Sequence, residues 1–314
     1  MASEFGARRV SCIIPSLGRG RILCDTIGML LAQSHRPHEI IIVDQTEALD
    51  EATWHALTEW EAKRDIRWLH QQELNASLAR NTGALAATGD VLLFLDDDIE
   101  IKTDFVAAHV RNYAEPKIVA VSGQVLEGRR HVLNDLPAAA KNDTLGWLYF
   151  PQNYGKRCRT NWMMSTNFSV RKDVFISVGG MDANYPKGAF REESDFSQRF
   201  QCAGHRFLFD PEASVYHLGA TGAPEGGSRS WIRNKRIAGW HHCVGDWYFT
   251  FGYLRQNGAA PLLKASLRHF VLNRYNITHP WWLPLLFLRW LAAIPLAAYL
   301  RWKGPRLIAS NSRV

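Results

Sequence analysis

The feature that most constrains the fold is an unbroken apolar run at residues 91–95, Val-Leu-Leu-Phe-Leu, followed at once by Asp96, Asp97 and Asp98. Such a run predicts a strand that is buried on both faces, as in the centre of a parallel sheet. Three adjacent carboxylates repel one another unless a cation neutralises them, and ligands of open α/β sheets bind at the carboxyl ends of the strands. The segment therefore predicts a divalent-metal site. The alternative is a solvated acidic turn before a helix expected near Thr103.

Apolar runs and helical patterns alternate through the N-terminal third of the chain. The predicted strands are residues 10–14, 39–43, 66–70 and 91–95, and the predicted helices between them are 22–30, 50–63 and 77–87. This alternation is typical of right-handed βαβ units and predicts a parallel, doubly wound sheet flanked by helices. We expect Pro15 and Ser16, which begin the turn after the first strand, to meet Asp44 and the Asp96 cluster at one edge of the sheet, where they would form a nucleotide crevice. By itself, Asp44 is equally compatible with a turn cap.

Two common nucleotide motifs are missing from the sequence. No G-x-G-x-x-G follows the first predicted strand and no G-x-x-x-x-G-K-[ST] occurs, which disfavours a dinucleotide oxidoreductase and a P-loop enzyme. The five cysteines show no C-x-x-C spacing, which predicts free thiols in a reducing compartment. Residues 1–9 contain no apolar segment of the kind that a secretory signal peptide requires, so we expect a cytoplasmic protein.

The positive charge of the chain is concentrated at its C-terminal end. The formal net charge is +7, but nine Lys and Arg residues follow Asp246 and no acidic residue does. Subtracting these nine leaves 28 Lys and Arg against 30 Asp and Glu, so the rest of the chain is nearly neutral. Because this larger part also has no interleaved basic and aromatic motif, the distribution disfavours a nucleic-acid-binding protein.

Five segments, in this order, resemble the motifs of family 2 glycosyltransferases with the GT-A fold. They are residues 10–16, 39–44, 79–83, 94–98 and 190–195. The resemblance implies a nucleotide-diphospho-sugar donor, with a UDP- or dTDP-sugar favoured, a Mn²⁺ or Mg²⁺ cofactor, and transfer with inversion at the anomeric carbon. The resemblance covers about residues 10 to 218, and we expect a GT-A domain at 1–228 followed by a C-terminal helical, basic tail at 229–314. Within the domain, the nucleotide-sugar half would run to about residue 125 and the acceptor half from about 126 to 228.

The resemblance also implies roles for residues of the first half. Asp98 would bind the metal ion, Asp96 would reach the ribose, and Asp97 would support the pair from behind. For Arg80, a surface helix charge is the alternative when its Ala-Arg-Asn-x-Gly context is ignored. The nucleotide-sugar contacts that the resemblance implies are Pro15, Ser16, Asp44, Arg80, Asn81, Asp96 and Asp97.

A second acidic cluster, Glu192-Glu193-Ser194-Asp195, precedes Phe196 and Phe200 at helical spacing. The resemblance assigns Glu193 as the general base, although family members usually carry Asp there, so the carboxylate is one methylene farther from the backbone. The alternative is an acidic first turn favoured by the helix dipole. Supporting roles toward the donor or acceptor are implied for Glu192, Asp195, Asn167 and Asp182. For Asn167 and Asp182, a buried structural role is equally compatible with the sequence.

His217 follows two further predicted strands, residues 207–210 and 213–217. Some family members use a histidine at this place as an additional metal ligand, and neutral imidazole suits Mn²⁺ better than Mg²⁺. The alternative is an ordinary histidine at a strand end. The glycine-rich residues 219–229 are either a lid that brings Arg229 or Arg233 to the diphosphate or a linker to the tail. The Gln-x-x-Arg-Trp pattern of polymer-making relatives is missing, which favours transfer of a single sugar.

Residues 281–300 of the tail are apolar and long enough to span a bilayer, but Pro284, Arg289 and Pro295 interrupt them. The aromatic residues of this region suit a segment lying at the membrane interface beside anionic lipid. A buried helical pair or oligomer contact and a true span are the alternatives. These aromatic residues are Trp281, Trp282, Trp290, Tyr299 and Trp302.

Together these features predict an inverting glycosyltransferase that lies peripherally at the inner face of the cell membrane. It would move one sugar to a hydroxyl of a glycan or lipid-linked acceptor, in surface polysaccharide or glycolipid synthesis. Two alternatives remain at this point. One is a nucleotide-sugar-binding protein without catalytic activity. The other is a nucleotidyltransferase built on a similar sheet, which would consume a nucleoside triphosphate and release pyrophosphate.

Overall fold

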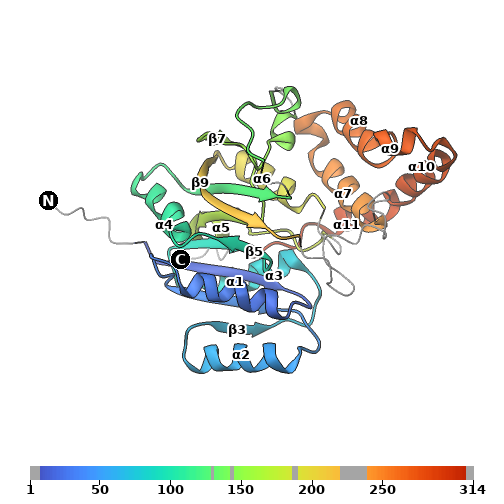
Figure 1. The fold of residues 1–314 in the computed structure, drawn as a ribbon. Helices are drawn as coiled ribbons and strands as arrows, with labels where there is room; N and C mark the ends of the chain where they lie inside the picture. Colours follow the sequence, from blue (N-terminus) through green and yellow to red (C-terminus); the bar gives the residue numbers. More distant parts are fainter. Residues whose placement is uncertain (1–7, 129–130, 142–144, 186–189, 220–238, 309–314) are drawn as a thin grey trace.

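The structure is a computed structural model that describes residues 8–128, 131–141, 145–185, 190–219 and 239–308. Its centre is a nine-stranded mixed sheet, and the strands follow the order β3-β2-β1-β4-β8-β6-β9-β5, with β7 paired to β9. Helices lie on both faces of the sheet, and a separate group of C-terminal helices lies against one side of it (Figure 1).

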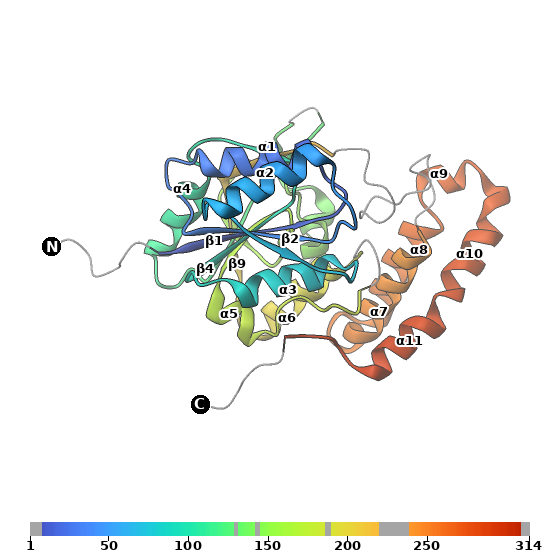
Figure 2. The ribbon, with the colours of Figure 1, turned by 90° about the horizontal axis from the view of Figure 1, so that it is seen from below.

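The N-terminal half of the sheet is parallel, as the alternation of elements predicts. Four strands, β1 to β4, pair side by side in the order β3-β2-β1-β4, and three helices connect them. Helices α1 and α2 cover one face and α3 covers the other (Figure 2). The strands are β1 Val10–Ser16, β2 Glu39–Asp44, β3 Arg67–His70 and β4 Val91–Leu95, and the helices are α1 Arg21–Leu31, α2 Glu51–Ala62 and α3 Ala76–Ala86.

The apolar runs do not alternate with polar residues because both faces of these strands are buried. In β1, Cys12 and Ile14 pack into the core under α1 and α2, whereas Ile13 between them packs into the core under α3. Every residue of β4 is buried. Burial on both faces is the physical reason for the continuous hydrophobicity of a central parallel strand.

The remaining strands extend the sheet beyond β4, and they pair with their neighbours in both parallel and antiparallel orientation. Strand β8 is antiparallel to β4 and β6, and β6 is parallel to β9. Strand β8 begins at Asn167, and the two strands predicted between 207 and 217 form one long strand. These elements are β5 Ile99–Ile101, β6 Ala120–Glu127, β7 Cys158–Thr160, β8 Asn167–Arg171 and β9 Phe207–His217.

The helix expected near Thr103 begins at Phe105, because the acidic run leads first into β5, which pairs with the end of β9. The other helices of this part are short, apart from α6. They are α4 Phe105–Val110, α5 Lys172–Ser177, α6 Glu192–Cys202, and the 3-10 helices η1 Arg111–Ala114, η2 Ala138–Lys141 and η3 Gly146–Tyr149.

Residues 239–303 form a helical cap with a hydrophobic core of its own, which also includes Leu145 and Tyr185 from the sheet domain. The boundary expected at residue 228 lies outside the described residues. By length and composition alone, Pro280–Lys303 could cross a membrane, and about a fifth of it is buried. The helices of the cap are α7 Trp240–Asn257, α8 Ala259–Phe270, α9 Arg274–Ile277, η4 Pro280–Trp282, α10 Leu283–Ala292 and α11 Ile294–Lys303.

Candidate active site

The carboxyl ends of β1, β2 and β4 meet at one edge of the sheet, where Ser16 pairs with Asp44 and the Asp96 run follows β4. The Ser16 hydroxyl donates to Asp97 Oδ2 at 2.8 Å, and Arg19 Nε lies 3.2 Å from Asp97 Oδ1. Burial raises the pKa of Asp97 to about 7, although Arg19 and Ser16 act in the opposite direction. Asp97 is thus directed toward the turn after β1.

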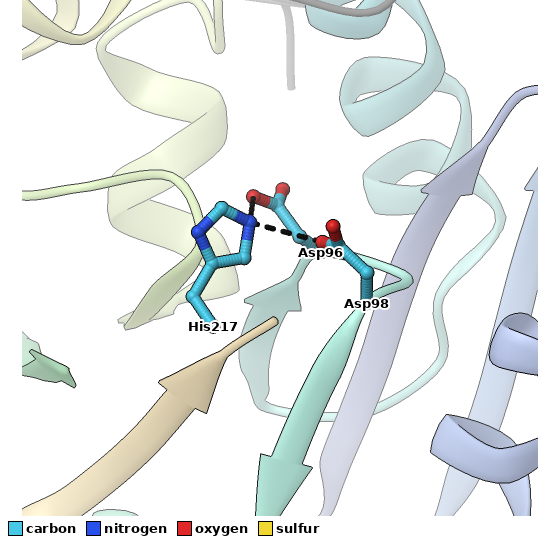
Figure 3. A group of neighbouring side chains, drawn as sticks. All are labelled: Asp96, Asp98 and His217. Carbon is cyan, nitrogen blue, oxygen red and sulfur yellow. Dashed lines mark ion pairs between the residues drawn. The ribbon is translucent and has the colours of Figure 1, made fainter. Parts of the chain in front are cut away.

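Asp96, Asp98 and His217 form the candidate metal centre (Figure 3). Each offers one ligand atom, and these atoms lie within 4.8 Å of one another. The Nε2 atom of His217 lies 2.9 Å from Asp98 Oδ1 and 3.7 Å from Asp96 Oδ2. The pairing of β5 with β9 creates this contact, because it places Ile99 opposite His217, and the Leu218 amide donates to the Asp98 carbonyl at 2.9 Å.

Glu127, at the end of β6, orients the imidazole of His217. Its Oε1 lies 2.7 Å from His217 Nδ1, so that Nε2 is directed toward the two aspartates. Burial lowers the pKa of His217, but hydrogen bonds to Asp98 and Glu127 outweigh burial and raise it to about 10. Arg19, whose Nη2 lies 3.4 Å from Asp98 Oδ2, adds a positive charge beside the acidic cluster.

These side chains fit a divalent cation. Two carboxylate oxygens and one imidazole nitrogen are ligands for Mn²⁺ and other transition ions, whereas Mg²⁺ prefers oxygen ligands. A carboxylate on the second ring nitrogen, the position of Glu127, is the usual outer contact of a metal-binding histidine. His217 Nε2 would coordinate without its proton, and a bound ion would supply the positive charge that balances the two carboxylates.

Arg80 connects this centre to the second acidic cluster. It is 4% exposed, and its guanidinium lies 2.9 Å from Glu192 Oε1 and 3.3 Å from Asp96 Oδ1. The Ser77 hydroxyl also donates to Glu192, and Thr166 Oγ1 donates to Asp96 Oδ2 at 2.6 Å. Burial raises the pKa of Glu192 to about 7, against the attraction of Arg80. The guanidinium holds two carboxylates that come from distant parts of the chain.

Glu193 lies next to this network, at the first turn of α6. Its Oε1 accepts hydrogen bonds from the Ser165 amide at 2.7 Å and from the Ser165 hydroxyl at 2.8 Å. Burial raises the pKa of Glu193 above its usual range. A raised pKa brings a carboxylate closer to the value that suits a general base near neutral pH.

The residue before this turn, Arg191, has a left-handed backbone conformation with φ of 77°. Outside glycine this conformation costs about 1–2 kcal/mol. The Arg191 side chain reaches the helical cap, where its Nε lies 2.8 Å from Asp246 Oδ1. Strained residues of this kind cluster at functional sites, where the surrounding structure enforces them.

Four predicted site residues have contacts that stabilise the fold. Asn81 donates to the Met181 carbonyl at 2.7 Å and accepts from its amide at 2.8 Å, so it holds the turn after α5. Asn167 donates to two backbone carbonyls on the neighbouring strands β6 and β9. Asp182 and Asp195 accept hydrogen bonds from tyrosine hydroxyls of α7 at 2.7 and 2.8 Å. For Asn167 and Asp182, the buried structural role is the interpretation that these contacts support.

Asp44 is buried at the end of β2. It accepts from the Thr46 amide at 2.9 Å and from Trp68 Nε1 at 3.3 Å, contacts that fit the turn-cap alternative. Pro15 is buried in β1 and pairs with Val43. Arg229 and Arg233, the residues of the expected lid, lie outside the described residues.

Several polar residues that contact the site are not among those predicted from the sequence. For Ser77 a signal exists, because it precedes Arg80 by three positions and therefore shares its helix face. For the others, the sequence carries no local signal, since tertiary contacts alone bring them to the site. These residues are Arg19, Glu127, Ser165 and Thr166.

The matches to known families and proteins agree with one another. A family model described as Glycosyl transferase family 2 matches residues 11–177, a little more than half of the chain. The chain is 26% identical to the O-antigen biosynthesis protein RfbC of Myxococcus xanthus, over 78% of this chain and 20% of the relative. It is 27% identical to the glucosyl-dolichyl phosphate glucuronosyltransferase of Haloferax volcanii, over 64% of this chain and 66% of the relative. The chain thus spans a fifth to two thirds of the length of these curated relatives.

Two solved structures are similar in fold. One is the mannosyltransferase PcManGT from Pyrobaculum calidifontis in complex with GDP-Man and Mn²⁺, with a TM-score of 0.54 and 18% identity over 96% of this chain and 80% of that one. The other is GalNAc-T7 with UDP, GalNAc and Mn²⁺, with a TM-score of 0.56 and 16% identity over 85% of this chain and 55% of that one. At these identities the similarity shows the GT-A fold.

Proposed function

The chain belongs to glycosyl transferase family 2, and from this premise we propose that it is a metal-dependent, inverting enzyme that transfers a single sugar to an acceptor hydroxyl. The donor in this proposal is a nucleotide-diphospho-sugar, with a UDP- or dTDP-sugar favoured. The observation that carries the proposal is the meeting of Asp96, Asp98 and His217 at the carboxyl end of β4, beside the network of Arg80 and Glu192.

Asp98 and His217 would hold a divalent ion, Mn²⁺ in preference to Mg²⁺ because of the imidazole nitrogen. When bound, such an ion stabilises the negative charge that develops on the departing nucleoside diphosphate. Asp96, which Arg80 and Thr166 hold in place, would reach the ribose. Asp44, Pro15 and Ser16 line the same edge of the sheet and would contact the nucleoside.

Glu193 is the proposed general base. It would take the proton of the acceptor hydroxyl while that oxygen attacks the anomeric carbon from the face opposite the diphosphate. The bond between the anomeric carbon and the diphosphate oxygen breaks as the new glycosidic bond forms, which inverts the configuration. Two hydrogen bonds from Ser165 orient the carboxylate, and burial raises its pKa.

The acceptor in this proposal is a glycan or a lipid-linked precursor, in the synthesis of a surface polysaccharide or glycolipid. The names of relatives support this class, including the O-antigen biosynthesis protein RfbC and the succinoglycan biosynthesis protein ExoM of Rhizobium meliloti, which is 28% identical over 55% of this chain. Residues 1–228 would form the catalytic domain, and residues 229–314 would hold it peripherally at the inner face of the cell membrane.

Donor binding and transfer can be tested separately. Calorimetric titration with UDP, dTDP and GDP, with and without Mn²⁺, should give Mn²⁺-dependent binding of one diphosphate. Asp98→Asn should weaken that binding by at least about tenfold, whereas the matched control Asp25→Asn, an exposed carboxylate of α1, should not change it.

Glu193→Gln should keep donor binding and lose about 100- to 10,000-fold in the transfer rate. Transfer at the wild-type rate in Glu193→Gln would refute the assignment of the base. Release of pyrophosphate from a nucleoside triphosphate, without turnover of any nucleotide sugar, would instead support a nucleotidyltransferase.

A further inference from the structure

The outward side of α10 and α11 is apolar from one end to the other. In the part of the chain that the structure describes, Trp281 is 68% exposed, Leu285 54%, Leu288 63%, Tyr299 49% and Trp302 82%. Steps of three or four residues separate the members, so they lie along one face of a helix. We name this face the outer stripe, and its members are Trp281, Leu285, Leu288, Ala292, Pro295, Tyr299 and Trp302.

The opposite side of the same helices is part of the core of the cap. Leu286 and Trp290 of α10 and Ala297 of α11 are buried there. Trp290 Nε1 donates to the Ser266 hydroxyl at 2.8 Å, and its carbonyl accepts from Trp247 Nε1 at 2.9 Å. The segment is therefore bound to α7 and α8 along its inner side, while its outer side meets solvent.

Residues 304–308, which follow α11, return to the sheet domain. The Ile308 amide donates to the Gly179 carbonyl at 2.9 Å, and the Ile308 side chain packs into the core under α3. The Ala183 amide donates to the Arg306 carbonyl at 3.0 Å. Both ends of the apolar segment are thus attached to the same body, and a path across a bilayer would have to break these contacts and the core of the cap.

The positive charge of the cap favours a bilayer over a second copy of the chain as the occupant of the outer stripe. No acidic residue follows Asp246, while nine basic residues do, and Lys264, Arg268 and Arg274 are exposed on α8 and α9 of the cap. Two copies of such a cap would bring like charges together. An anionic lipid surface attracts these bases, and tryptophan and tyrosine side chains favour the headgroup region.

We propose that the outer stripe lies in the plane of an anionic membrane surface, inserted to the depth of the headgroups, and that Pro280–Lys303 does not cross the bilayer. The cap is joined to the sheet domain beside the site, since Tyr253 of α7 donates to Asp195 in the helix that carries Glu193, and Tyr248 donates to Asp182. The membrane would therefore lie at a constant distance from the acceptor side of the site. Lipid binding needs no turnover, so the proposal is tested independently of the proposed reaction.

Flotation of the full chain with vesicles tests the proposal. Wild type should float with vesicles of equal parts phosphatidylcholine and phosphatidylglycerol, should not float with phosphatidylcholine alone, and should be released by alkaline carbonate. The double variant Leu288→Glu with Trp302→Glu should lose at least about 100-fold in partition, because two exposed apolar side chains become anions. The matched control is Trp54→Glu, an aromatic residue 49% exposed on α2, and α2 lies away from the helices of the cap (Figure 1). Its partition should equal that of wild type.

Three results would overturn the proposal. Retention of wild type in the vesicles after the carbonate wash would indicate a spanning segment. Unchanged flotation of the double variant, with a melting temperature like that of wild type, would show that the outer stripe does not bind lipid. A dimer of the wild type that fails to float, and that the double variant dissociates, would identify a second copy as the occupant.

Discussion

Acidification should destabilise this protein through His109, a buried residue of α4. His109 is 1% exposed, and both ring nitrogens are bonded. Because the Asn167 amide donates to two carbonyls, its Oδ1 must accept, so the proton is on His109 Nε2, 2.9 Å away. Nδ1 then accepts from the Ser169 hydroxyl at 2.9 Å, and that hydroxyl accepts from Tyr113 at 2.8 Å. A neutral imidazole with its proton on Nε2 therefore satisfies both of its ring nitrogens.

Burial lowers the pKa of His109 to about 4, from 6.5 for an unperturbed histidine. Between pH 6.5 and pH 4 the unfolded chain therefore binds a proton at His109 and the folded chain does not, so the stability of the fold decreases as the pH falls. Between pH 7 and pH 5 the free energy of unfolding should decrease by about 2 kcal/mol from this residue alone. Below pH 4 the loss should level off at about 3 kcal/mol.

Urea denaturation of wild type and His109→Gln at pH 7 and pH 5 measures this contribution. Glutamine can still donate to Asn167 but does not titrate, so the wild type should lose about 2 kcal/mol more than the variant over this interval. Asp97 and Glu192 have raised pKa values and stabilise the fold as the pH falls, but they are present in both proteins and cancel. Equal pH dependence in the two proteins would refute a neutral, buried His109.

Three further substitutions test other parts of the structure. Arg80→Ala should lower the free energy of unfolding by about 3–5 kcal/mol, because it leaves Glu192 buried without its cation. Urea denaturation measures this loss, and a loss below about 1 kcal/mol would contradict the buried ion pair. Gly123→Ala would place a Cβ 2.2 Å from Asn167 Nδ2 and 2.3 Å from a backbone carbonyl of β9. The melting temperature should therefore fall by several degrees, and an unchanged melting temperature would contradict this close approach. Arg306→Ala breaks only an exposed ion pair and should cost less than about 1 kcal/mol in the same denaturation assay, whereas a larger loss would show that the pair is coupled to residues 304–308.

The order and direction of strands β1 to β4 follow from the amino-acid sequence. Residues 12–14, 40–43 and 91–95 are apolar without interruption because each strand is covered on both faces, and this pattern distinguishes a central parallel strand from an amphipathic one. Strand direction then places Ser16, Asp44 and the Asp96 run at one edge, because parallel strands end on the same side. Local pattern and connection rules suffice for these features.

Which side chains meet at that edge depends on long-range contacts that the sequence does not reveal. The contact of His217 with Asp98 depends on the register of β5, a strand of three residues whose sequence has no distinguishing pattern. Asn167 and Asp182 resemble site residues in sequence, yet their hydrogen bonds hold strands and the helical cap, because the partners of a polar side chain depend on long-range packing. For residues 281–302 the sequence alone left a span, a surface helix and a buried pair open. The contact of the inner face with α7 and the return of residues 304–308 to the sheet domain favour the surface helix that we propose. Composition could not reveal them, because attachment at both ends is a property of the folded chain.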